Sequence, residues 1–400
     1  MSCTPNIYRV TTLENNGPGS LLDGLLYAGT PETPRWIVFE VSGTIVLDAT
    51  HQLIESAKHI HVFGNTSPFS VGAGGGGIQI VGWPMALVDC EDITISNVAW
   101  SLGIAPDPSN DKWWNPIKVL TSSPGQMSRD ISFLQCSFRG GQDENDMGPL
   151  NHSAWDWDVT AIEDLTFDSC LFAWCFDRAN GDHHNMSLMT NATERAVIRR
   201  CLMAHNNRRS PQCHGSAAIV NNVVYNYGSS AVACMAGGEY TVKDNTFMPG
   251  PQSRVNPPWA PISIQPNTNF SGDTHIHMAG NLRTQFAGIP ASSGPDLFDN
   301  QDEDATAYFP EHEPIRDWWQ GDVSDPQAVI ENAGTIYRDA WDVKCRDTIS
   351  QQTGGWARTE HAIGGIPVYP ELHSQLVLPS LRPDDLKQWL NQYRPPGLPV

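Results

Sequence analysis

The chain has 400 residues, of which 40% are hydrophobic and 17% are charged, and its formal net charge at pH 7 is −20. This composition supports a large folded core and excludes a globally disordered chain. The excess of acidic residues argues against a nucleic-acid partner, because phosphate binding needs a basic surface. No apolar run is long enough for a membrane-spanning helix, so we expect no membrane partner.

The N-terminal segment predicts a short helix followed by strands. Ser20 stands three residues before Asp23, and two leucine pairs follow Ser20 at helical spacing. A capping residue ahead of an apolar face is typical of a helix N-terminus. We expect this helix to cover the N-terminal end of the fold, because an open sheet end exposes unpaired backbone. Residues 36–39 and 43–46 are the first strand-like runs.

A short motif then recurs along the chain: a strand with alternating apolar positions, a polar pair, and Asn, Cys or Val. It ends at residues 65, 98, 136, 170, 201, 223, 245 and 281, with separations of 33, 38, 34, 31, 22, 22 and 36 residues. Separations of 22 suit a bare coil of a right-handed parallel β-helix, and the longer ones suit coils that carry loops. The predicted fold class is therefore all-β.

We expect one domain, residues 1–400, with three parts. Residues 1–35 form the N-terminal cap, residues 36–285 form the β-helix coils, and residues 286–400 form a C-terminal segment that wraps along the coils. The repeat fades from about residue 283, and residues 384–391 are the helix candidate of the C-terminal segment.

The repeat also predicts how its last positions stack. Cys136, Cys170 and Cys201 occupy one position on successive coils, about 4.8 Å apart. We favour buried thiols there over a disulfide. Asn245 and Asn281 are expected at turns, where an amide bonds neighbouring backbone. The nine cysteines include no CxxC pair, which argues against a zinc site.

Two adjacent arginines, Arg208 and Arg209, lie between the strand-like runs 196–200 and 217–220. A guanidinium fork matches the geometry of a carboxylate, so the pair suits an anionic ligand. The alternative is a solvated basic turn. His183 and His184 point to opposite sides if their segment is extended, and we expect one of them to line a cleft.

Two acidic groups precede these arginines. Residues 142–146 read Gln-Asp-Glu-Asn-Asp, and Asp156 and Asp158 share a face if their segment is extended. Carboxylates with amide neighbours suit calcium, which takes six to eight oxygens. The alternative is a solvated loop in an acidic protein.

Several of these motifs resemble the pectate lyase superfamily, polysaccharide lyase family 1. Residues 205–211, His-Asn-Asn-Arg-Arg-Ser-Pro, resemble its AHNN-R-x-P segment, and residues 135–145 resemble its DHCSFSWGTDEN segment. Residues 36–45 are similar to its first core strand, and the resemblance covers residues 8–282. It implies β-elimination on a uronic-acid polymer. An arginine removes the C5 proton, calcium neutralises the carboxylate as a Lewis acid, and the 4-O-glycosidic oxygen leaves.

Carried onto this chain, the arginine of R-x-P is Arg209. The family's second arginine falls on His214, its lysine falls near Arg178, and an early calcium-binding aspartate falls near Asn115. Because of the departures at Asn115 and His214, a related uronan is an alternative substrate to ordinary pectate. The expected site is therefore the catalytic Arg209; the substrate-binding Arg178, Arg208, His214, His184 and Trp155; and the calcium ligands Asp143, Glu144, Asp156 and Asp158. Trp113, Trp114 and Trp157 are further candidates for stacking on sugar rings, with packing in the core as the alternative.

The leading hypothesis is a secreted, monomeric polysaccharide lyase whose signal peptide is not part of this sequence, with an acidic polysaccharide as substrate and Ca²⁺ as cofactor. A β-helix hydrolase with paired carboxylates is the second hypothesis. A non-catalytic carbohydrate-binding protein is the third, and it fits the departures at Asn115 and His214.

Overall fold

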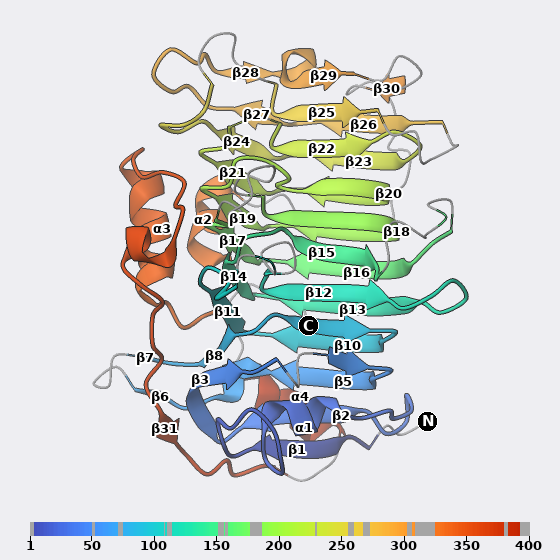
Figure 1. Ribbon diagram of the computed structural model, residues 1–400, viewed down its shortest axis with the longest axis vertical. Coiled ribbons are helices and arrows are strands. Elements are labelled where there is room, and N and C mark those ends of the chain that lie inside the picture. Colours follow the sequence, from blue (N-terminus) through green and yellow to red (C-terminus); the bar gives the residue numbers. More distant parts are fainter. Residues whose placement is uncertain are drawn as a thin grey trace.

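The structure is a computed structural model. It describes residues 4–49, 53–70, 75–107, 109, 114–150, 156, 159–176, 186–228, 230–254, 260–266, 273–301, 306–308, 325–379 and 383–392. These residues form a right-handed parallel β-helix, in which short strands stack coil upon coil (Figure 1). The predicted fold class is confirmed. None of the helices in the described part is long and apolar enough to cross a membrane.

Three parallel ladders of strands run the length of the molecule. Ladder 1 contains β1 (Asn6–Val10), β2 (Arg35–Phe39), β5 (Lys58–Phe63), β10 (Glu91–Ser96), β13 (Ser128–Leu134), β16 (Ile162–Asp168), β18 (Leu188–Arg199), β20 (Gln212–Val220), β23 (Glu239–Lys243), β26 (His275–Ala279) and β30 (Thr306–Tyr308). Ladder 2 contains β4 (Leu53–Glu55), β9 (Met85–Val88), β12 (Ile117–Thr121), β15 (Asn145–Pro149), the first parts of β18 and β20, β22 (Val232–Met235), β25 (Ile262–Gln265) and β29 (Phe298–Asn300). Because β18 and β20 run through both ladders, the two form one 18-stranded sheet within the described residues.

Ladder 3 closes the coil. It contains β3 (Val41–Leu47), β8 (Ile78–Gly82), β11 (Val98–Leu102), β14 (Ser137–Gly140), β17 (Leu171–Ala173), β19 (Leu202–Ala204), β21 (Val223–Tyr225), β24 (Thr246–Met248) and β27 (Leu282–Arg283). Two short strands are antiparallel to its ends, β28 (Ser292–Ser293) on β27 and β31 (Leu372–His373) on β3. A hairpin, β6 (Phe69–Ser70) with β7 (Gly75–Gly76), projects between β5 and β8.

The interior is filled by residues at equivalent positions of successive coils. Phe133 stacks on Phe167 with ring centroids 5.0 Å apart, and Phe138 stacks on Phe172 at the same distance. Repeating one large side chain at one register position gives continuous packing, because strands are spaced at about 4.8 Å. Such repetition is how coils that cannot bury an apolar face alone share a core.

The cysteine stack is confirmed as buried thiols. Cys136, Cys170 and Cys201 are free and fully buried, and the backbone N–H of Cys170 donates to Cys201 Sγ at 3.4 Å. An asparagine ladder continues the same position. Asn222 Nδ2 donates to Asn245 Oδ1 at 3.0 Å, and Asn245 Nδ2 donates to Asn281 Oδ1 at 3.0 Å.

The ladder corrects the repeat at one coil. The motif as aligned ends at Val223, but the strand register pairs Val223 with Thr246, so Asn222 occupies the stacked position. The two consecutive asparagines made the alignment ambiguous by one residue. The amide ladder selects Asn222, because its side chain bonds the coils on both sides: Cys201 N donates to Asn222 Oδ1 at 2.9 Å.

The predicted N-terminal helix is α1 (Leu21–Leu25), and Ser20 caps it by accepting from Asp23 N at 3.2 Å. Its leucines join the main core beside Ile37. β1 lies ahead of this helix in the chain and pairs in parallel with β2, so the first ladder begins before residue 35.

The C-terminal segment runs back along the coils (Figure 1). It contains α2 (Pro326–Asn332), α3 (Ala340–Ser350), β31 and α4 (Pro383–Asn391). The helix at 384–391 is confirmed as α4, whereas α2 and α3 were not expected. Their apolar residues cover the outer face of ladder 3, where Trp341 and Ile349 pack against Trp174 and Tyr225 in a second buried cluster.

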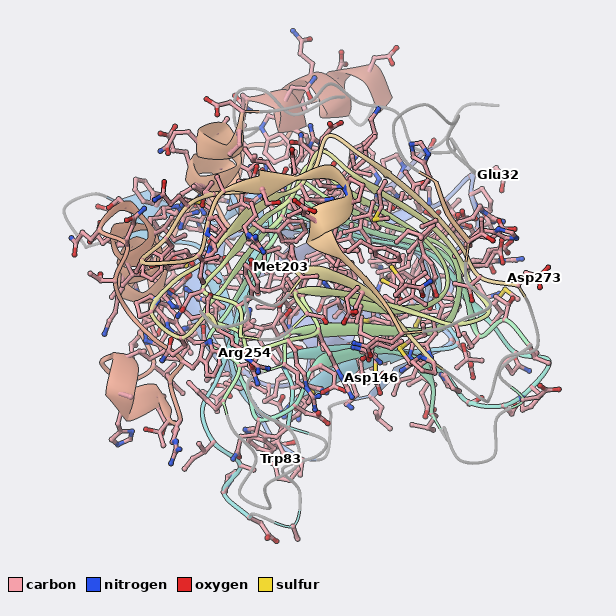
Figure 2. The ribbon with its side chains drawn as sticks, turned by 90° about the horizontal axis from the view of Figure 1, so that it is seen from above. Glu32, Trp83, Asp146, Met203, Arg254 and Asp273 are labelled. Atoms are coloured by element: carbon pink, nitrogen blue, oxygen red, sulfur yellow. The ribbon has the colours of Figure 1, made fainter. Side chains whose placement is uncertain are left out.

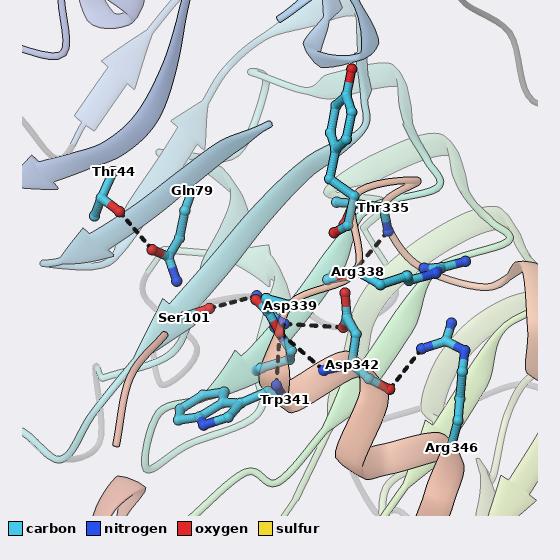
Figure 3. Close-up of polar contacts among 12 residues, drawn as sticks. Thr44, Gln79, Ser101, Thr335, Arg338, Asp339, Trp341, Asp342 and Arg346 are labelled. Atoms are coloured by element: carbon cyan, nitrogen blue, oxygen red, sulfur yellow. Dashed lines mark hydrogen bonds and ion pairs between the residues drawn. The ribbon is translucent and has the colours of Figure 1, made fainter. Parts of the chain in front are cut away.

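α3 is joined to the coils by a buried charged group. Arg139, on β14, is fully buried and contacts Asp339 Oδ1 at 2.5 Å, Asp342 Oδ1 at 3.0 Å and Ser101 Oγ at 2.8 Å. Figure 3 shows Asp339 and Asp342 at the start of the helix, beside Ser101 of β11. Burial raises the pKa of the Asp342 carboxyl, and the Arg139 charge opposes that rise.

Candidate active site

The loops that leave ladder 3 and enter ladder 2 carry the predicted basic and acidic residues. Asp143 and Glu144 lie between β14 and β15, and Arg208 and Arg209 lie between β19 and β20, two coils further on. One edge of the β-helix therefore holds both groups. The structure brings them together although 65 residues separate Glu144 from Arg209.

Arg209 forms an ion pair with Glu144. Its Nη1 donates to Glu144 Oε1 and lies 3.5 Å from the sulfur of Met189. The side chain of Arg209 is 17% exposed and that of Glu144 is 3% exposed, so the pair is shielded from water with the guanidinium on the outer side. A paired carboxylate fixes the direction of a guanidinium because the two groups bond in a plane.

The backbone at Arg209 is held in place from both neighbouring coils. Its φ is 55°, in the left-handed region that few non-glycine residues adopt. Its carbonyl accepts from Leu188 N and from Ser187 Oγ, both at 2.9 Å. On the other side, Ser210 N donates to Ala231 O at 2.7 Å, and the Ser210–Pro211 peptide bond is cis.

Arg208 lies beside this ion pair and has a different environment. Its Nε is buried without a hydrogen-bond partner. Burial and the adjacent charge of Arg209 lower the pKa of Arg208, and Glu144 acts in the opposite direction. Two neighbouring guanidinium groups share this edge with the carboxylates of Asp143 and Glu144, so the edge carries charges of both signs, and Arg208 can offer its planar fork to an anionic ligand.

The acidic loop is held by Asn115, from the coil before it. Asn115 Nδ2 donates to the backbone carbonyl of Glu144 at 2.6 Å, and Glu144 N donates to Asp143 Oδ1 at 3.1 Å. Asn115 therefore acts here as a backbone support. The remaining oxygen, Asn115 Oδ1, is buried without a hydrogen-bond partner.

The outer face of ladder 2 places Asp146, from the predicted acidic group, in a row with three residues that were not predicted. The strand register aligns Lys118, Asp146, Met189 and Gln212 on four successive coils. Asp146 accepts from Asn191 Nδ2 at 2.9 Å. Figure 2 looks down the coils and shows Asp146 at their lower edge, with Met203 in the interior. Alternation along each strand would have placed these side chains outward once the register was known.

His214 also faces this row. It is 8% exposed, and its Nε2 lies 3.0 Å from Nε2 of Gln212. The Gln212 amide is the donor in this contact, so the His214 ring carries its proton on Nδ1 when neutral. Met189 and Gln212 link the two predicted residues: the sulfur of Met189 lies 3.5 Å from Arg209 Nη1 and 3.6 Å from Nε2 of Gln212, which in turn contacts His214.

The remaining predicted residues fall into two groups. Asp156 is exposed and lies in the loop that follows β15. The residues Arg178, His184, Trp155 and Asp158, like Trp113 and Trp157, lie outside the described part of the chain. Trp114 is 3% exposed, stacks edge-on against Trp83 at 5.0 Å and donates from Nε1 to Gly103 O at 3.0 Å. Trp114 is packed in a small buried cluster with Leu102 and Ala105, so of the two alternatives for this residue core packing holds and sugar stacking does not.

The described residues do not make a calcium site by themselves. Within them, no group of three or more His, Cys, Asp or Glu side chains is arranged to hold a metal ion. Glu144 is engaged with Arg209, and Asp156 lies in the loop that follows β15. A cavity of about 620 Å³ lies between α3 and residues 367–370, and none of the predicted site residues lines it.

The curated proteins and the solved structure that are similar to this chain are all named pectate lyases. No protein-family model matches the chain. It is 25% identical over 310 residues to "Probable pectate lyase C" of Emericella nidulans, which covers 74% of this chain and 62% of that protein. It is 24% identical over 253 residues to the protein of the same name from Aspergillus terreus, covering 62% and 51% respectively. The chain thus spans less than two thirds of the length of these relatives.

A solved structure has the same fold. A pectate lyase from a Bacillus species, solved in complex with trigalacturonate, superposes with a TM-score of 0.50 and 14% identity. The superposition covers 79% of this chain and 89% of that one. The resemblance read from the sequence is confirmed: this chain is similar to proteins named pectate lyase, and it has the right-handed parallel β-helix fold.

Proposed function

We propose that the protein is a polysaccharide lyase that cleaves pectate or a related uronic-acid polymer by β-elimination. The observation that carries the proposal is the ion pair of Arg209 with Glu144, on the outer edge of the coils and beside a second arginine. The relatives named pectate lyase and the shared fold support the same conclusion.

In the proposed reaction Arg209 removes the proton from C5 of a uronic acid. The electron pair of that C–H bond becomes the C4–C5 double bond, and the 4-O-glycosidic oxygen leaves with a proton from solvent. Arginine is protonated up to a pH above 12, so it acts as a base only where its charged form is disfavoured. Glu144 orients the guanidinium and must be drawn partly away from it as the substrate binds.

Substrate binding would use the cationic groups around this pair. Arg208 offers a planar fork to a sugar carboxylate, and His214 and Gln212 offer polar contacts on the outer face of ladder 2. Arg178, His184 and Trp155 remain predictions, because they lie outside the described residues.

Calcium also remains a prediction, with Asp143, Glu144, Asp156 and Asp158 as its proposed ligands. The described residues do not fit the ion unless Glu144 separates from Arg209, so no step of the reaction is assigned to it. Added Ca²⁺ should raise turnover, and a chelator should abolish it, if these residues bind the metal. We also propose that the protein is secreted and acts as a monomer.

A substrate panel tests the function. Pectate, methylated pectin, alginate and glucuronan are each incubated with the protein, with and without chelator, and the ultraviolet absorbance of the new conjugated double bond is followed. We expect absorbance to rise on at least one uronan, and Arg209→Lys to lower the rate by about 10²–10⁴-fold, the usual contribution of a positioned base.

Arg129→Lys is the matched control, because Arg129 forms an exposed pair with Glu91 on ladder 1, away from the site. Reducing ends without ultraviolet absorbance would instead indicate the hydrolase alternative, which needs two free carboxylates. Binding without any cleavage by the wild type would indicate the carbohydrate-binding alternative.

A further inference from the structure

The turn that carries the arginines begins at a buried histidine. His205 follows β19 and is fully buried, four residues before Arg209. Its ring stacks on Trp174 with centroids 5.1 Å apart and an interplanar angle of 2°, and meets Tyr225 edge-on at 5.2 Å. These contacts fix the plane of the ring, since both neighbours belong to the packed outer face of ladder 3.

Both ring nitrogens of His205 have partners. Nδ1 lies 3.2 Å from Asn226 Nδ2, whose amide is the donor, and Nε2 lies 2.7 Å from Thr348 Oγ1. With Nδ1 accepting, the neutral ring carries its proton on Nε2 and donates it to Thr348. Burial, and to a smaller extent Lys344, lowers the pKa of His205 to about 3, which keeps the ring neutral.

Thr348 belongs to α3, so this hydrogen bond comes from the C-terminal segment. Further contacts from this segment reach the same corner. Tyr225 donates from its hydroxyl to Thr353 O at 2.7 Å, and Trp356 donates from Nε1 to Asn226 O at 2.8 Å. The segment therefore holds the corners of two successive coils, after β19 and after β21.

Between His205 and Arg209 the turn has a second support. Asn206 Nδ2 donates to Phe172 O at 3.1 Å, and Asn206 Oδ1 accepts from Cys175 N at 3.2 Å. His205 and Arg209 both have left-handed backbone, with φ of 59° and 55°. A turn with two such residues keeps one shape only where surrounding contacts hold it there.

We propose that Thr348 is a positioning residue for the arginines: by holding His205, α3 fixes the turn on which Arg208 and Arg209 are presented. The inference rests on the proposed function for its kinetic consequence, and on geometry alone for its effect on the turn. A displacement of about 1 Å at a reacting group lowers turnover by up to about a hundredfold. The C-terminal segment is therefore part of what makes the site competent.

The test compares the full-length wild type with Thr348→Val, which keeps the shape and removes the hydroxyl acceptor, and with Thr348→Ser, which keeps the hydroxyl. Ser350→Ala is the control, because Ser350 is exposed on the same helix and its hydroxyl donates to Asp347 O within that helix. Turnover is measured on a uronan that the wild type cleaves. Hydrogen exchange is measured for the peptide that contains residues 205–211.

We expect Thr348→Val to lower kcat by about tenfold to about a hundredfold with KM within about twofold, because the substrate contacts stay while the base is misplaced. Exchange in residues 205–211 should be about tenfold faster, and the strands of ladder 1 should be unchanged. Thr348→Ser should restore both values. If Thr348→Val is recovered unfolded, Thr348→Cys, with a weaker acceptor, replaces it and should give intermediate values.

An unchanged kcat and unchanged exchange in the turn would overturn the inference, as would a loss of activity that follows only the folded fraction or that Thr348→Ser fails to restore. A wild type inert on every uronan would refute the proposed function instead. The exchange of residues 205–211 would then decide the positioning role by itself.

Discussion

Arg139 offers the sharpest test of what joins α3 to the coils. The guanidinium is fully buried and faces two carboxylates, Asp339 and Asp342, with Ser101 as a further partner. Replacing Arg139 by Met keeps an unbranched side chain but leaves Asp342 buried without its main counter-charge. Removing one partner of a buried ion pair costs about 3–5 kcal/mol, because the other charge stays desolvated. Asp339 suffers less, since it also accepts from Trp341 N at 2.8 Å as the N-cap of α3.

The free energy of unfolding is measured from equilibrium urea denaturation, with two independent probes to establish a single transition. We expect Arg139→Met to lower it by about 3–5 kcal/mol, and Arg139→Met with Asp342→Leu to recover much of the loss, because an apolar pair replaces a buried charged one at little cost. Arg129→Met, which breaks an exposed pair, should cost at most about 1 kcal/mol. A loss below about 1 kcal/mol for Arg139→Met, or a double variant no more stable than the single one, would refute this reasoning.

Three further predictions concern the asparagine ladder and the pH dependence of stability. Asn245→Ala should lower the free energy of unfolding by about 2–4 kcal/mol in urea, because it orphans buried groups of Asn222 and Asn281; a loss under 1 kcal/mol would contradict the ladder's role. The pKa of His205 is lowered, so its stabilising contribution is present above about pH 6.5 and is lost as pH falls toward about 3. The melting temperature of His205→Gln, measured by thermal scans, should not show this loss. A wild-type melting temperature that stays constant over the same pH range would exclude the contribution. The pKa of Asp130 is raised by burial and by neighbouring acids, so the free energy of unfolding falls as pH rises from the ordinary carboxyl pKa through the raised one. Asp130→Asn, which also suits the φ of 55°, should make the melting temperature depend less on pH and should raise it at neutral pH. A pH dependence of the melting temperature equal to that of the wild type would count against this prediction.

The repeat made most of the coils predictable. Apolar positions alternate in each strand, and Cys or Asn recurs at one place, so the fold class followed from spacing alone. The error at Val223 arose because two asparagines stand together and only the hydrogen-bond ladder distinguishes them. α2 and α3 were missed because they pack on ladder 3 through scattered residues such as Trp341 and Ile349, without the repeat that marks the coils.

The site was predictable in its residue types but less so in its partnerships. Arg209 was predicted as the base and Glu144 as a calcium ligand, but their ion pair was not predicted. The pair forms because the two residues lie two coils apart in the stack, and no local sequence motif encodes that distance. Met189 and Gln212 were not named, since a single outward side chain has no signature until the strand register aligns it with its neighbours. Asn115 was read as a weak metal ligand, and it supports the Glu144 carbonyl.

The return of the C-terminal segment changes how the stack of coils should come apart. A solenoid whose units contact only their neighbours can fray from either end. Here β31 pairs with β3, and Leu390 of α4 packs against Trp36 of β2, so the last part of the sequence clasps the first coils. The two ends of the chain are therefore in contact, and the first coils can unfold only when a segment more than 300 residues away in sequence separates from them. Unfolding should accordingly be more cooperative than in an open repeat array of the same length, and cleavage between α3 and β31 should loosen the N-terminal coils before the middle ones.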